Sequence, residues 1–74
     1  MSFSVARISG RLFCQLSNAE AKSIQDLASA KVWGAAYAAL HNCSVMILDS
    51  DGPLGVAAPV CSIDDHGVEK KVGQ

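Results

Sequence analysis

The sequence has 74 residues, half of them apolar and 18% charged, with a formal net charge of −1 at pH 7. This length permits one domain, residues 1–74, with a small core, and the apolar content excludes an intrinsically disordered chain. The charge excludes non-specific nucleic-acid binding, which requires a clear surplus of Lys and Arg.

The sequence also predicts a cellular location. It has neither a secretory signal pattern nor an apolar stretch long enough to cross a bilayer. We therefore expect a cytoplasmic protein with no membrane partner. In that reducing compartment the three cysteines, Cys14, Cys43 and Cys61, are expected to be free thiols that pack as small apolar side chains.

Residues 3–16 have the alternation of a β-hairpin with one face on a core. Ser9-Gly10 is predicted to form its two-residue loop, because glycine adopts the positive φ that such loops need. This loop would pair Ile8 with Arg11. The expected inner face consists of Phe3, Val5, Leu12, Cys14 and Leu16.

A long helix is predicted across residues 18–41. A capping box that begins at Ser17 favours the early start, and a second capping box begins at Ser23. As a third reading, residues 19–23 extend the second strand instead. His41-Asn42 predicts the end of the helix, because Asn tolerates the left-handed conformation that follows a last turn.

Two further strands are predicted at residues 44–48 and 54–61. Asp51-Gly52 is the expected loop between them, and it would pair Ile47 with Val56. Residues 68–72 either add a short strand or fray. The order of elements predicts an α+β fold, a two-layer ββαββ domain whose antiparallel sheet is covered on one face by a single long helix.

The predicted helix has two apolar faces, whereas a small domain buries only one. The first face is expected to pack on the sheet, because small side chains allow close approach; it consists of Ala21, Ile24, Ala28, Val32, Ala35 and Ala39. The second face is predicted to bind a partner, because Trp and Tyr are enriched at the centres of interfaces. The candidate partner-binding residues are Trp33, Tyr37, Leu40, Ala30 and Asp26.

Two alternatives to this reading remain. In the first, the helix is turned round, so that the aromatic residues pack on the sheet and the alanine stripe faces water. In the second, the partner is a second subunit, and the protein is a structural homodimer or part of a larger assembly. Replacing Trp33 distinguishes a core aromatic from an interface aromatic.

No residue pattern identifies a reaction or a cofactor, and we expect no enzyme and no bound metal. The nearest candidate is a zinc site with ligands His41, Cys43, Cys61 and His66, but their spacing lacks the short CxxC or HxxxH pairs of structural zinc sites. Asp49-Ser50-Asp51-Gly52 begins like a calcium loop, yet its twelfth position is Val60 and supplies no carboxylate. A small zinc- or thiol-dependent enzyme is the third functional alternative.

Residues 27–56 contain, in order, Leu27-Ala28-Ser29-Ala30-Lys31, Val45-Met46-Ile47, Gly52 and Leu54-Gly55-Val56-Ala57. This series resembles a group of small phage-encoded proteins that includes anti-CRISPR inhibitors of type I surveillance complexes. The resemblance implies a non-enzymatic inhibitor that occludes the surface of a host protein or ribonucleoprotein complex. The basic and aromatic residues that such inhibitors place in later strands are absent, so no binding residue is carried over.

Overall fold

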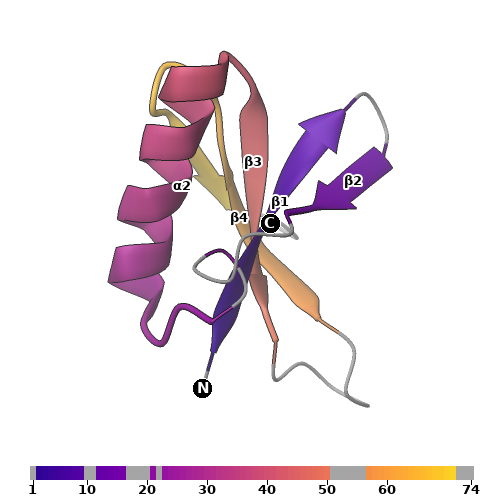
Figure 1. The fold of residues 1–74 in the computed structure, drawn as a ribbon. Coiled ribbons are helices and arrows are strands. Elements are labelled where there is room, and N and C mark those ends of the chain that lie inside the picture. Colours follow the sequence, from indigo (N-terminus) through magenta and orange to yellow (C-terminus); the bar gives the residue numbers. More distant parts are fainter. Residues whose placement is uncertain (1, 10–11, 17–20, 22, 51–56, 72–74) are drawn as a thin grey trace.

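The computed structural model describes residues 2–9, 12–16, 21, 23–50 and 57–71. These form a five-stranded antiparallel sheet in the order β2-β1-β3-β4-β5, with helix α2 on one face (Figure 1). The elements are β1 Phe3–Ser9, β2 Leu12–Gln15, α2 Leu27–His41, β3 Ser44–Asp49, β4 Ala58–Ile63 and β5 Glu69–Lys71. The predicted two-layer ββαββ fold is confirmed. Residues 68–72 were expected either to add a short strand or to fray, and β5 is such a short strand at the edge of the sheet.

The first hairpin is correct as an element but not in its predicted register. Ile8 pairs with Phe13 and Ser9 pairs with Leu12, so the connection is residues 10–11 and not Ser9-Gly10. Moving a two-residue loop by one position shifts the pairing by two residues. Because side chains alternate with a period of two, both registers give the same inner face, and the hydrophobic pattern cannot distinguish them.

The second hairpin differs more from the prediction. Ile47 pairs with Cys61 and not with Val56, and β4 begins at Ala58. The pairing with β3 is irregular between Ile47 and Leu48, where Leu48 lies opposite Pro59. Among the described residues β5 pairs with β4 from Cys61 to Ile63, and Pro59 lies outside this pairing, as suits a residue with no N–H. The predicted loop Asp51-Gly52 lies outside the described residues.

Helix α2 begins later than either predicted start. Asp26 is the N-cap, with an extended backbone, and its carboxylate accepts a 2.9 Å hydrogen bond from the N–H of Ser29. Residues before it are held by the sheet: Ile24 and Phe3 exchange both of their backbone hydrogen bonds across an isolated bridge. A residue bonded in this way cannot take part in a helical turn, so the predicted continuous helix over residues 18–41 and the start at Ser23 are wrong. Ala21 itself is helical and not part of a strand, and the capping box that begins at Ser17 lies outside the described residues.

The predicted end of the helix is confirmed. Asn42 adopts the left-handed conformation, with φ 51°, directly after His41. The N–H of Cys43 donates to the carbonyl of Ala38 at 3.1 Å, the six-to-one bond of a Schellman motif.

The core lies between α2 and the sheet, mainly over β3 with β1 and β4 on either side. Its fully buried members from the strands are Val5, Val45, Ile47 and Cys61. On the opposite face of the sheet the small side chains of Ser4 and Ala6 are also buried. They pair with Leu48 and Met46 on the neighbouring strand, so each small side chain lies beside a long one.

Candidate interaction surface on helix α2

The stripe of α2 that contacts the sheet consists of Ala30, Gly34 and Ala38, each four residues after the last. The predicted stripe is wrong at Ala28, Val32 and Ala39, which are exposed, Val32 by 72%. Its other three members do contribute to the core: Ala21 is fully buried, and Ile24 and Ala35 pack against it. The physical reason is size. A Cβ added to Gly34 would lie 2.9 Å from Cδ1 of Ile47. The stripe with the smallest side chains therefore lets the helix approach the sheet most closely.

The five predicted partner-binding residues differ in how far they are exposed. Ala30 is fully buried against the sheet, so including it in a surface was wrong. Leu40 is 78% exposed. Trp33 and Tyr37 are half-buried and pack against the edge of the core. Asp26 is exposed and caps the helix, and the hydrogen bonds from Ser29 hold the pKa of its carboxyl below its usual range.

Three aromatic rings form a ladder along one edge of α2. Trp33 and Tyr37 are stacked with ring centroids 5.4 Å apart, and the rings of Tyr37 and His41 lie 4.2 Å apart at a tilt of 31°. The spacing of four residues puts successive rings one turn apart on the same side. The ladder therefore fixes the position of Trp33 between the core and the outer face of the helix.

The outer face of α2 carries no charged residue and is mostly apolar. We define it as the exposed residues on the side away from the sheet, namely Ala28, Ser29, Val32, Ala36, Ala39 and Leu40, together with the half-buried Trp33. Near its N-terminal end a shallow depression of about 360 Å³ is lined by Ala28, Ser29, Val32 and Trp33. A helix that is apolar all round is normally covered on all sides, whereas the described part of this chain covers one side.

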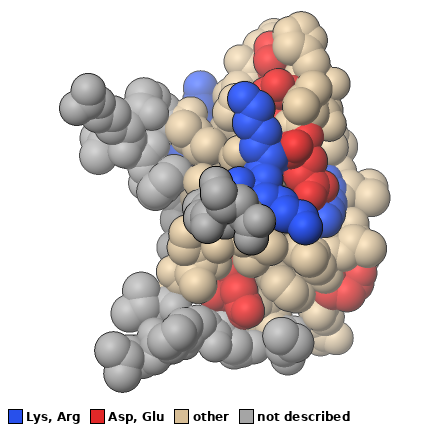
Figure 2. All heavy atoms as spheres, turned by 180° about the vertical axis from the view of Figure 1, so that it is seen from behind, with Lys and Arg blue, Asp and Glu red and all other residues tan. Residues whose placement is uncertain are grey.

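The only Lys, Arg, Asp or Glu within α2 lies off this face. Lys31 forms an ion pair with Glu69 of β5, with 3.1 Å between Nζ and Oε2. Seen from behind, acidic and basic side chains lie next to one another (Figure 2). The visible surface of the described residues thus mixes both signs of charge and offers no broad basic area for a polyanion.

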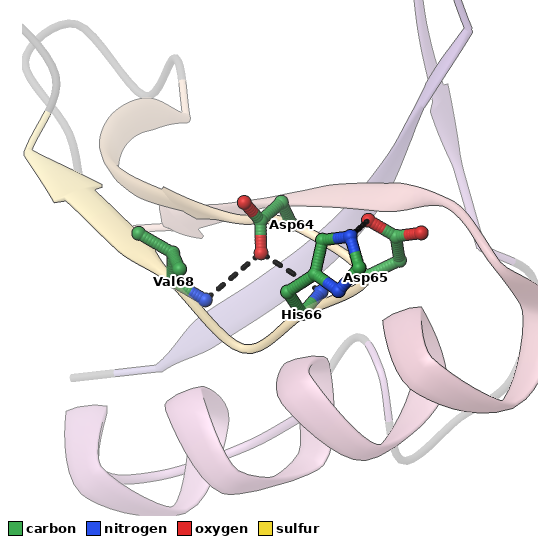
Figure 3. Close-up of polar contacts among 4 residues, drawn as sticks. All are labelled: Asp64, Asp65, His66 and Val68. Atoms are coloured by element: carbon green, nitrogen blue, oxygen red, sulfur yellow. Dashed lines mark hydrogen bonds and ion pairs between the residues drawn. The ribbon is translucent and has the colours of Figure 1, made fainter.

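The turn between β4 and β5 is organised by one carboxylate (Figure 3). Oδ1 of Asp64 accepts hydrogen bonds from the N–H groups of His66 and Val68, both at 2.9 Å. These bonds, the one from Val68 above all, hold the pKa of Asp64 below its usual range. His66 is exposed, with its Nε2 3.7 Å from Asp65 Oδ1. This arrangement closes the turn between β4 and β5.

The described residues that were considered as zinc ligands are not gathered into one cluster. Among the described residues no three His, Cys, Asp or Glu side chains gather closely enough to hold a metal ion. Cys61 is buried, and its burial raises the pKa of the thiol, so the reactive thiolate is disfavoured. Cys43 is half-exposed. The side chain of Cys14 lies outside the described residues, and its expected burial stays a prediction.

Two features of this surface were missed by sequence reasoning. One is the ion pair between Lys31 and Glu69, which joins residues far apart in the chain. The other is the depression beside Trp33, which depends on how the helix is turned.

In the described part of the chain no helix has the length and apolar character needed to span a membrane. Comparison with protein-family models, curated proteins and solved structures gives no significant match.

Proposed function

We propose that this protein is a non-enzymatic binding module that associates with a protein partner through the outer face of α2. The observation that carries the proposal is the exposure of Val32 and Leu40 on a helix whose other side is already packed on the sheet. Leaving such side chains in water forgoes about 25 cal/mol for each Å² of apolar surface. A partner that covers this face recovers that free energy.

The half-buried aromatic residues support the same proposal. Trp33 borders both the core and the depression, so its ring is already ordered before a partner binds. The stack with Tyr37 restricts it further. An ordered aromatic side chain loses little conformational entropy on binding, which is why such residues dominate interface energies.

The experiment compares variants in which an exposed apolar side chain becomes polar. Val32→Ser and Leu40→Ser change the outer face, and Val68→Ser is the matched control, because Val68 is also exposed but follows the β4–β5 turn. Each tagged variant is used to capture partners in the native host, and each captured protein is then purified and titrated against the variants.

The proposal predicts at least tenfold weaker binding for Val32→Ser and Leu40→Ser, unchanged binding for Val68→Ser, and the same melting temperature for all. A purified partner whose affinity is equal for all variants would contradict it. The resemblance to phage-encoded inhibitors would make the partner a host complex in the cytoplasm, and this identity stays a prediction.

A further inference from the structure

We infer that the outer face of α2 binds a second copy of this chain, with the two helices antiparallel about a twofold axis near Ala36. This inference rests on the proposed function and names its partner. The face carries both a protruding side chain, Leu40, and a depression lined by Ala28, Ser29, Val32 and Trp33. A surface with a projection and a hollow on the same helix is suited to pairing with itself.

The spacing of these two features fixes the symmetry. The depression is centred near residues 30–31, and Leu40 lies about 14 Å further along the helix at 1.5 Å per residue. A twofold axis midway between them passes close to Ala36. An antiparallel pair about this axis places each Leu40 over the other copy's depression, whereas a parallel pair would place Leu40 against Leu40 and leave both depressions open.

The small side chain of Ala36 lies where the two helices would approach most closely. It is exposed and belongs to the outer face. Helices with small residues at the crossing point approach to the lower end of the usual interaxial range of about 8–10 Å. Leu40 can then reach into the depression of the partner.

The distribution of charge favours the same arrangement. The outer face has no charged residue, so two copies meet there without repulsion between like charges. In the antiparallel pair the two helix dipoles oppose each other favourably, whereas in a parallel pair they would align unfavourably.

The size of the face predicts a weak dimer. A helix of 15 residues offers a strip about 22 Å long and about 10 Å wide. This is less than the roughly 800 Å² per partner of a standard stable interface. We therefore expect a reversible dimer with a dissociation constant on the order of 100 µM.

The test is sedimentation equilibrium of the full chain from about 5 µM to about 1 mM, with charge-swapped variants at the twofold axis. Ala36→Glu and Ala36→Lys each place like charges against their own copy and should weaken the dimer at least tenfold. An equimolar mixture of the two should restore a heterodimer at low salt. The matched controls are Val68→Glu and Val68→Lys, which should dimerise like the wild type.

Leu40→Ser provides a second variant that does not depend on placing a charge at the axis. Because Leu40 is exposed, this change should leave the melting temperature of the monomer unchanged and abolish the dimer. A wild-type chain that stays monomeric at 1 mM would overturn the inference, while a Leu40-dependent partner from the host would keep the proposed function. A dimer unaffected by Leu40→Ser and by both Ala36 variants would overturn self-association through this face. Equal binding of a purified partner by all serine variants would overturn the proposed function.

Discussion

Gly34 of α2 lies so close to Ile47 of β3 that a methyl group on its Cα would be 2.9 Å from Cδ1 of Ile47. The same methyl group would be 3.2 Å from Cγ2 of Val45. Ile47 and Val45 are fully buried, so neither can move aside into solvent. This contact sets the distance between the two layers of the domain.

Gly34→Val is therefore expected to destabilise the fold by about 1–3 kcal/mol, because the added carbons must push the helix off the sheet. Ala39→Val is the control: Ala39 is exposed in the same helix, and the change there costs about 0.5 kcal/mol of helix propensity. Urea unfolding followed by circular dichroism measures both. Equal stability of the two variants would contradict the close approach at Gly34.

How far the sequence predicts this fold is clear from particular residues. Alternation in residues 3–8 and an apolar run at residues 45–48 identified strands β1 and β3, and Asn42 identified the end of the helix. The register of the first hairpin did not follow, because a pattern of period two is satisfied by any shift of two residues. The register of the second hairpin did not follow either: the partner of Ile47 is Cys61, five residues beyond the predicted Val56, and the pairing contains an irregularity that alternation does not encode. The start of α2 followed neither capping box, since Ile24 bonds to a strand far from it in the chain.

The candidate surface was predicted in part. The two apolar faces of the helix were recognised from the sequence, but the stripe on the sheet, which consists of Ala30, Gly34 and Ala38, matches neither of them. The sequence reading placed the first face on the sheet, although Ala28, Val32 and Ala39 are exposed. It chose the stripe with the most alanine, and it overlooked that glycine at position 34 permits a closer approach than any alanine. The contacts of Gly34 with Ile47 and Val45 of β3 help to determine which way the helix is turned, and the sequence alone does not show them.

The ion pair between Lys31 and Glu69 links the helix to the edge strand, and its strength can be measured. Both side chains are about one-third exposed. A double-mutant cycle with Lys31→Ala and Glu69→Ala should give a coupling energy of about 0.2–1 kcal/mol that decreases at 1 M salt. Faster hydrogen exchange of the β5 amides should accompany either change. A coupling energy of zero at low salt would show that this ion pair does not help to hold β5 in place.

Acid should weaken the β4–β5 turn through Asp64. Folding lowers the pKa of this carboxyl, so the unfolded chain takes up a proton at a higher pH than the folded chain. The contribution of Asp64 to stability is therefore complete above the unfolded-state pKa of about 3.9 and is lost as the pH falls through the lower, folded-state pKa.

Asp64→Asn tests this dependence, because the amide oxygen of Asn can accept the same two hydrogen bonds but does not titrate. The melting temperature of the wild type should exceed that of the variant at pH 6, and the difference should shrink as the pH falls below about 4. A difference that stays constant down to pH 2 would mean that the hydrogen bonds to Asp64 do not depend on its charge.

The cysteines should differ in their rates of modification. Cys43 is half-exposed and should react with iodoacetamide in the folded protein, whereas Cys61 is buried with a raised pKa and should react only when the protein unfolds. Peptide mapping after timed labelling gives each rate separately. Cys14 is expected to react as slowly as Cys61, and its rapid labelling would contradict its predicted place on the inner face of the first hairpin.

The edge strand β5 limits how this protein can assemble. Its three residues, Glu69, Lys70 and Lys71, are all charged and exposed. Short edge strands with lysine resist pairing with the sheet of another molecule, because such pairing would crowd like charges and place them in a drier environment. Growth of the sheet from this edge into a continuous fibre is thereby discouraged. The association proposed through α2 about a twofold axis would close after two copies, so such self-association would give a finite particle.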